Sequence, residues 1–195
     1  NEQERMAEFE QLVRSTHAAG LKVIIDFVPN HVAPDYADAN GGIKTLHRYD
    51  YDWSDTDKID YSDRQNWDRL LSIIRFWADK GADGFRCDMA ELVPLDFWRY
   101  LILAAKQSHP GLEFIAEVYE MDSYDRFIYT GCFDWLYDKS GLYDTLREIV
   151  AGSRNAWDIT GVWQRLGSLQ PHMLNFLENH DEQRLASPWF AGSAA

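Results

Sequence analysis

The chain has 195 residues, of which 46% are hydrophobic and 14% aromatic, which is enough for one substantial core and excludes a disordered chain. Its formal net charge of −13 opposes binding to phosphate backbones and anionic lipids, and no apolar run is long enough to span a bilayer, so we expect neither a nucleic-acid partner nor a membrane segment in this chain. Cys87 and Cys132 have no metal-ligand spacing and the first residues lack a secretory signal pattern, so the compartment stays open.

Helix-like and strand-like segments alternate along the chain. An amphipathic helix is predicted from Glu2 to Ala19, and a buried, β-branched strand follows over residues 21–28. Further strands are predicted over residues 84–87, 113–116, 133–137 and 173–177, with helices over residues 67–77, 94–110 and 143–150. This α/β alternation predicts a parallel sheet with right-handed crossovers. Because no phosphate-binding glycine motif follows any strand, part of an eight-fold barrel is favoured over an open doubly wound sheet.

One long segment interrupts the alternation. Residues 31–63 are polar and aromatic, with no sustained period and with Gly41 and Gly42 near the middle. A loop of this length in a compact domain is usually functional, so we expect it to pass over the site. The domain is therefore predicted as residues 1–195, with residues 31–63 as a short excursion.

Polar residues follow four of the five predicted strands. They are Asp26 with Asn30 and His31, Arg86 with Asp88, Glu117, and Asn179 with His180 and Asp181. The carboxyl ends of parallel barrel strands share one rim, so we expect these side chains to converge there. Carboxylates gathered in a cleft suggest glycoside hydrolysis, which needs a proton donor and a second carboxylate that attacks or activates water.

Four segments carry a resemblance to a known family. Residues 26–31 (DFVPNH), 84–88 (GFRCD), 114–118 (FIAEV) and 176–181 (FLENHD) resemble the four signature regions of the α-amylase family, glycoside hydrolase family 13. The resemblance implies an incomplete (β/α)8 TIM barrel, from about the second helix through the seventh strand, with the excursion after the third strand. It also implies retaining cleavage of α-1,4-glucosidic bonds in starch-like glucans or maltooligosaccharides by double displacement, with no organic cofactor.

The same resemblance implies roles for individual residues. Asp88 would be the nucleophile, Glu117 the acid that later acts as base, and Asp181 the third carboxylate, which binds sugar hydroxyls. His31 and His180 would also donate hydrogen bonds to the substrate. Asn30 matches a position that ligates calcium in many family members, which makes calcium a possible structural ion.

Elementary electrostatics agrees with this division of roles. Arg86 lies two residues before Asp88 on one strand face, so it should keep that carboxylate ionised. Glu117 follows the apolar run Phe114–Ala116, where partial desolvation favours a protonated acid. Asp26 would orient Arg86, and the competing interpretation of that pair is a purely structural ion pair.

The sequence also leaves alternatives open. Family members that cut starch often carry Lys-His three and four positions after the nucleophile, where this chain has Glu91 and Leu92. This departure keeps a 4-α-glucanotransferase as the first alternative. A non-catalytic carbohydrate-binding barrel is the second, and it is less favoured because all three carboxylates are present. Tyr51 and Trp53 are candidates for stacking on a glucose ring, although the run Asp50–Asp55 is more typical of a solvated loop.

Overall fold

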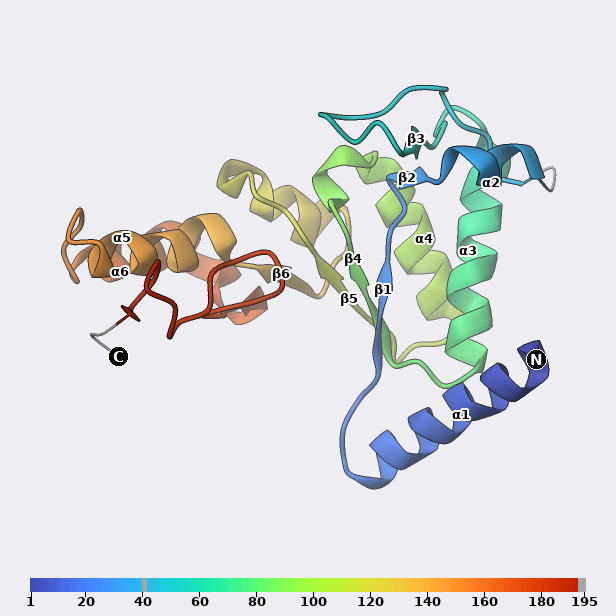
Figure 1. The fold of residues 1–195 in the computed structure, drawn as a ribbon, viewed down its shortest axis with the longest axis horizontal. Helices are drawn as coiled ribbons and strands as arrows, with labels where there is room; N and C mark the ends of the chain where they lie inside the picture. Colours follow the sequence, from blue (N-terminus) through green and yellow to red (C-terminus); the bar gives the residue numbers. More distant parts are fainter. Residues whose placement is uncertain (40–41, 193–195) are drawn as a thin grey trace.

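A computed structural model of the chain describes residues 1–39 and 42–192, so Gly41 of the excursion lies outside the described residues (Figure 1). Its centre is a parallel five-stranded sheet in chain order. The strands are β1 (Ile24–Phe27), β4 (Gly84–Cys87), β5 (Glu113–Ala116), β6 (Trp135–Tyr137) and β7 (Met173–Leu174). Helical segments separate the strands, which confirms the predicted parallel α/β fold.

The register of the sheet aligns the C-terminal ends of the strands β1, β4 and β5. Asp26 is paired with Arg86 across β1 and β4, and Cys87 is paired with Ala116 across β4 and β5. Backbone hydrogen bonds continue past the strand ends, where the Asp88 N–H donates to the Phe27 carbonyl at 2.9 Å and the Glu117 N–H donates to the Cys87 carbonyl at 3.1 Å. Asp88 and Glu117 therefore leave neighbouring strands at the same edge.

Two long helices cover one side of this part of the sheet. They are α3 (Arg64–Asp79) and α4 (Leu95–Ser108), which lie side by side (Figure 1). Their apolar faces bury Trp98, which is fully inaccessible and stacks edge-on against Phe27 and Phe133. Helix α1 (Glu2–Ala18) begins with an asparagine capping box and packs Phe9 against Trp77 of α3. The helices expected at these positions are present, and α3 and α4 each bury one apolar face, whereas α1 buries Val13 alone.

Gly84 is required by close contact between two strands. A Cβ at this position would lie 2.2 Å from the Glu113 carbonyl oxygen of β5. No real Cβ tolerates that distance, so any side chain here would push β4 and β5 apart. The spacing of the two strands that precede Asp88 and Glu117 depends on this glycine.

The second half of the chain is more irregular than the sequence predicts. It contains η2 (Met121–Ser123), two single π-helical turns, η3 (Arg126–Thr130) and η4 (Lys139–Tyr143), then α5 (Asp144–Val150), α6 (Asp158–Leu166) and η5 (Gly167–His172). Helix α6 was not predicted. The strand expected over residues 173–177 is shorter, because β7 ends at Leu174 and the chain then runs without regular structure to Asp181.

The excursion has structure of its own. Two short strands, β2 (His31–Val32) and β3 (Asp57–Lys58), pair in antiparallel, and α2 (Pro34–Ala39) follows β2. The buried Asp57 carboxylate accepts hydrogen bonds from the Thr45 hydroxyl at 2.6 Å and the Arg48 N–H at 3.0 Å. Within residues 1–39 and 42–192, no helix has the length and apolar character needed to cross a membrane.

Candidate active site

One guanidinium connects three of the predicted carboxylates. Arg86 Nη1 donates to Asp88 Oδ1 at 2.7 Å and to Asp26 Oδ1 at 3.0 Å, and Nη2 lies 2.9 Å from Glu117 Oε1. The Arg86 side chain is 9% exposed and the Glu117 side chain 5%, whereas Asp26 is 57% exposed. The predicted pairing of Asp26 with Arg86 is present, and the same arginine also contacts Glu117, which the sequence did not indicate.

Burial outweighs the neighbouring arginine at Asp88. Desolvation raises the pKa of this carboxyl, the hydrogen bond from Arg86 lowers it, and the charge of Glu117 raises it further, so the net direction is upward from the ordinary value of 3.8. Arg86 acts in the expected direction, since both its hydrogen bond and its charge lower the pKa of Asp88, but burial has the larger effect. A partly desolvated carboxylate beside a second carboxyl group is a common arrangement in catalytic sites.

Glu117 receives donors on both of its oxygens. Tyr119 Oη donates to Oε1 at 2.8 Å, and the backbone N–H of Met89 donates to Oε2 at 2.8 Å. Met89 adopts a left-handed backbone conformation with φ 42° and ψ 45°, which is uncommon for a residue with a side chain and aims its N–H at Glu117. Such local strain directly after Asp88 is typical of a functional site.

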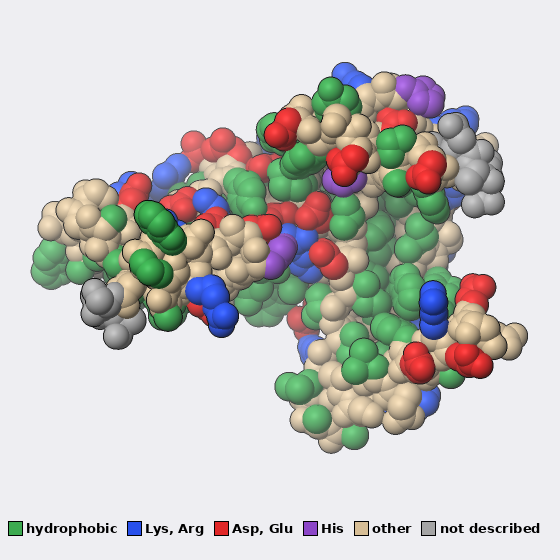
Figure 2. Space-filling model, in the orientation of Figure 1, with side chains coloured by type: hydrophobic (Ala, Val, Ile, Leu, Met, Phe, Trp, Pro, Cys, Tyr) green, Lys and Arg blue, Asp and Glu red, His purple; other side chains and the backbone are tan. Residues whose placement is uncertain are grey.

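The carboxylates open onto a cavity of about 550 Å³ between the sheet edge and the excursion. Its walls are formed by His31, Tyr51, Asp52, Trp53, Asp88, Met89, Glu117, Tyr119 and Asp181. Figure 2 shows acidic, basic and histidine side chains gathered where the sheet meets the C-terminal segment. Trp53 packs against both Tyr51 and His31, with ring centroids 4.9 Å and 5.6 Å apart. The structure thus brings together four predicted site residues and the two aromatic candidates.

Two residues that were predicted for the site, His180 and Asn30, do not line this cavity in the described part of the chain. The exposed ring of His180 has Nε2 3.1 Å from Asp181 Oδ2. Asn30 is 1% exposed, and its Nδ2 donates to Asp50 Oδ2 at 2.9 Å. Its Oδ1 is buried and has no hydrogen-bond partner among the described residues. An orphaned buried oxygen of this kind is suited to a cation ligand.

Sequence reasoning missed two residues that contact the site. Tyr119 follows Glu117 by two positions, and the alternation of an extended chain puts such residues on the same side, so this signal was present. Glu91 was noted only as a departure from the family pattern. Its Oε2 accepts hydrogen bonds from the backbone N–H of Tyr119 at 3.1 Å and of Glu120 at 3.0 Å. Glu91 therefore holds the chain segment that follows Glu117.

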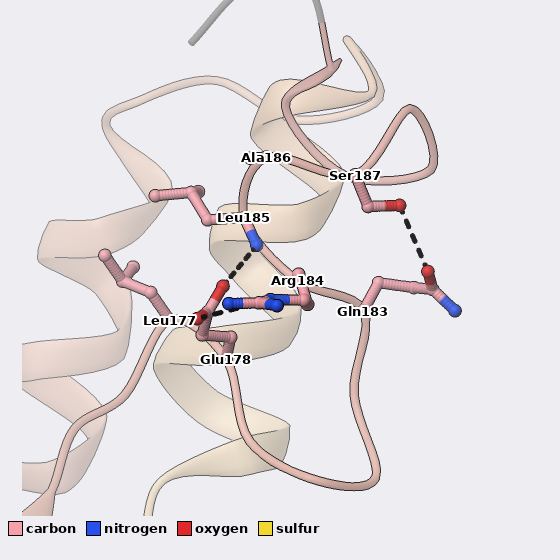
Figure 3. Close-up of a pocket in the computed structure, with 7 residues that line it drawn as sticks. All are labelled: Leu177, Glu178, Gln183, Arg184, Leu185, Ala186 and Ser187. Atoms are coloured by element: carbon pink, nitrogen blue, oxygen red, sulfur yellow. Dashed lines mark hydrogen bonds and ion pairs between the residues drawn. The ribbon is translucent and has the colours of Figure 1, made fainter.

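A larger hollow of about 840 Å³ lies in the C-terminal segment, between Leu177 and Ser187 (Figure 3). Its one carboxylate, Glu178, accepts the backbone N–H of Leu185 at 2.7 Å and lies 3.9 Å from Arg184. A single carboxylate held this way does not provide the acid and the nucleophile that a glycosidic bond requires. The smaller cavity at Asp88 and Glu117 is therefore the candidate active site.

Comparison with known proteins agrees with this geometry. The chain is 34% identical over 197 residues to "Alpha-amylase MalA" of Haloarcula japonica. The aligned region covers 91% of this chain and 29% of that protein. It is 29% identical over 124 residues to an "Alpha-1,4-glucan:maltose-1-phosphate maltosyltransferase" of Cereibacter sphaeroides, covering 57% of this chain and 21% of that protein. No protein-family model matches the sequence.

Solved structures give the same result for the fold. The crystal structure of an alpha-amylase from Lactobacillus plantarum superposes with a TM-score of 0.76 at 27% identity, over 92% of this chain and 47% of that one. The parallel sheet described above is thus an incomplete (β/α)8 barrel. The chain spans less than half the length of these similar proteins.

Proposed function

This chain belongs to the α-amylase family, and we propose that the intact protein cleaves α-1,4-glucosidic bonds of starch-like glucans or maltooligosaccharides with retention of configuration. The observation that carries the proposal is the pair Asp88 and Glu117, which leave neighbouring strands and share one guanidinium. Retaining enzymes place their two carboxyl groups about 5–5.5 Å apart, whereas inverting enzymes leave room for a water between them. Two carboxylates that contact one guanidinium are compatible with the closer arrangement.

In the proposed mechanism Asp88 is the nucleophile. Its carboxylate attacks the anomeric carbon while Glu117 protonates the departing glycosidic oxygen, which gives a covalent glycosyl-enzyme and a free sugar end. Glu117, now ionised, then removes a proton from water, and the resulting hydroxide releases the sugar from Asp88. The burial of Glu117 supports this exchange because few waters compete for the proton.

The remaining residues bind substrate in this proposal. Asp181 and His31 line the same cavity as the reacting carboxylates, so they are available to the hydroxyls of the sugar at the cleavage point. His180 contacts Asp181 and supports its orientation. The aromatic wall formed by Tyr51 and Trp53 offers a flat surface on which a glucose ring stacks through its C–H groups.

The test is product analysis on maltoheptaose and soluble starch with the intact protein. The Asp88→Asn variant should lose at least about a thousandfold in rate. Asp96→Asn is the matched control, because it makes the same chemical change on an exposed carboxylate of α4 and should leave the rate unchanged. Proton NMR of the first product should show the α-anomer. If the β-anomer appears first, the double displacement is refuted.

A second function is favoured by two observations. This chain has Glu91 where starch-cutting members often carry Lys, and it is similar to a maltosyltransferase. Both observations suggest that the subsite for the acceptor sugar differs from that of the starch-cutting enzymes. A 4-α-glucanotransferase uses the same carboxylates and transfers the sugar from Asp88 to another glucan in place of water. Products longer than maltoheptaose in the same assay would identify it. Binding of starch without any product would instead support the non-catalytic barrel.

Calcium is proposed as a structural ion only. Asn30 Oδ1 is a buried oxygen that has no partner within the described part of the chain, and the Asp50 carboxylate accepts a hydrogen bond from Nδ2 of the same side chain. These two groups would hold the ion, which would fix the excursion to the end of β1 and take no part in proton transfer. The Tm of the protein should fall on addition of EDTA and recover with CaCl₂. An unchanged Tm would rule the ion out, since Lys58, 2.6 Å from Asp50, then supplies the positive charge alone.

A further inference from the structure

Glu91 and Tyr119 form a chain of contacts that ends on Glu117. Glu91 lies in the short helical turn η1 (Ala90–Leu92), and its Oε2 accepts two consecutive backbone N–H groups, those of Tyr119 and Glu120. A carboxylate that accepts two backbone donors fixes the position of that backbone. This interaction fixes the origin of the Tyr119 side chain.

The Tyr119 hydroxyl is aimed at one oxygen of Glu117. Tyr119 Oη donates to Glu117 Oε1 at 2.8 Å, and the Lys139 ammonium lies 5.7 Å from the centre of the tyrosine ring. Burial raises the pKa of the Tyr119 phenol, and the hydrogen bond to Glu117 raises it further. The phenol therefore stays protonated and remains a donor throughout the neutral range.

The hydrogen bonds to Glu117 distinguish its two oxygens. A carboxylate offers about four acceptor positions, two on each oxygen. Arg86 Nη2 and Tyr119 Oη both contact Oε1, while Oε2 accepts the Met89 N–H. Among the described residues Tyr119 and Met89 are the hydrogen-bond donors to the Glu117 side chain, and the Arg86 contact is an ion pair at Oε1. A positive charge beside Oε1 disfavours a proton on that oxygen, so the proton is better placed on Oε2.

We propose that Tyr119 is a positioning residue that holds Oε1 of Glu117 beside the Arg86 charge, that Glu91 positions Tyr119, and that Oε2 is therefore the oxygen that delivers and removes the proton. This role rests on the proposed function of Glu117 as the acid and base. In the first step the Oε2–H bond breaks as the proton passes to the glycosidic oxygen, and the electron pair stays on the carboxylate. In the second step Oε2 takes a proton from water. Without Tyr119, the protonated carboxyl has a second orientation, which does not face the substrate.

The test compares two substrates that differ in their need for the acid. Cleavage of maltoheptaose needs a proton on the leaving oxygen, whereas α-maltosyl fluoride loses fluoride with little protonation. We expect Tyr119→Phe to lower kcat/KM for maltoheptaose by about tenfold or more and for the fluoride by less than about threefold. Glu91→Ala should show the same selective loss. Glu91→Gln should restore most of the rate, because its amide oxygen still accepts both N–H groups.

Tyr129→Phe is the matched control, since it removes an exposed hydroxyl that contacts only Ser168 among the described residues. It should leave both substrates unaffected, and Tm measurements on each variant show whether the fold is intact. Equal losses on both substrates, or no loss, would overturn the positioning role and leave the proposed function standing. If the unmodified protein cleaves neither substrate, the proposed function fails and this role fails with it. The Glu91 variants decide the question if Tyr119→Phe does not fold.

Discussion

Replacing Arg86 with Met should destabilise the intact protein strongly, because it leaves buried carboxylates without their cation. The side chains of Glu117 and Asp88 are 5% and 23% exposed, so each loses its pairing in a poorly solvated place. Removing one partner of a buried ion pair costs about 3–5 kcal/mol. Asp26 is mostly exposed and adds less than about 1 kcal/mol. The expected loss at neutral pH is therefore about 3–5 kcal/mol.

The pH dependence of this loss has a definite sign. Arg86 lowers the pKa of Asp88, so the stability it contributes is present while the carboxyl is ionised and is lost as the pH falls through the pKa in the folded protein. Urea unfolding of Arg86→Met and of the parent should therefore differ most at neutral pH and converge in acid. The control is Arg99→Met, which changes an exposed arginine of α4 and should cost less than about 0.5 kcal/mol. A loss below about 1 kcal/mol, or one that does not change with pH, would refute the reasoning.

Three further outcomes are expected. The acid limb of kcat/KM on maltoheptaose should have its midpoint above pH 3.8, because burial raises the pKa of Asp88 and protonation removes the nucleophile; a midpoint at or below that value would contradict the role of burial. Gly84→Ala should lower the free energy of unfolding, measured in urea, by about 1–3 kcal/mol, because the new Cβ meets the Glu113 carbonyl. The control Gly161→Ala places its Cβ in open space on α6 and should raise the free energy of unfolding by about 0.5–1 kcal/mol. Trp53→Ala should raise KM for maltoheptaose roughly fivefold through loss of stacking, with kcat nearly unchanged; an unchanged KM would remove Trp53 from the substrate surface.

The rule that parallel strands end at one edge accounts for most of what the sequence predicted. Asp26, Arg86, Asp88 and Glu117 each follow or end a strand with a clear apolar pattern, and the structure brings their side chains into contact. Asp181 reaches the same cavity although β7 ends well before it. The strands β2 and β3 could not be predicted, because two-residue strands show no periodicity.

The interactions around the carboxylates were less accessible to prediction. The net effect on Asp88 depends on how deeply it is buried, which a sequence does not give, and the contribution of Arg86 alone pointed the other way. The contact of Glu91 with the backbone after Glu117 depends on the turn at η1 and not on a residue pattern. The left-handed conformation of Met89 has no sequence signal either, since neither Gly nor Asn occupies that position.

The left-handed conformation of Met89 links the two reactive carboxylates through the main chain. The peptide unit that follows Asp88 is itself the donor to Glu117 Oε2, and the next N–H, of Ala90, donates to the Glu117 carbonyl at 2.9 Å. Two consecutive N–H groups after Asp88 thus hold both the side chain and the main chain of Glu117. A shift of the backbone at residues 88–90 would therefore move the acid together with the nucleophile, so the relative placement of the two groups is coupled through the main chain as well as through Arg86.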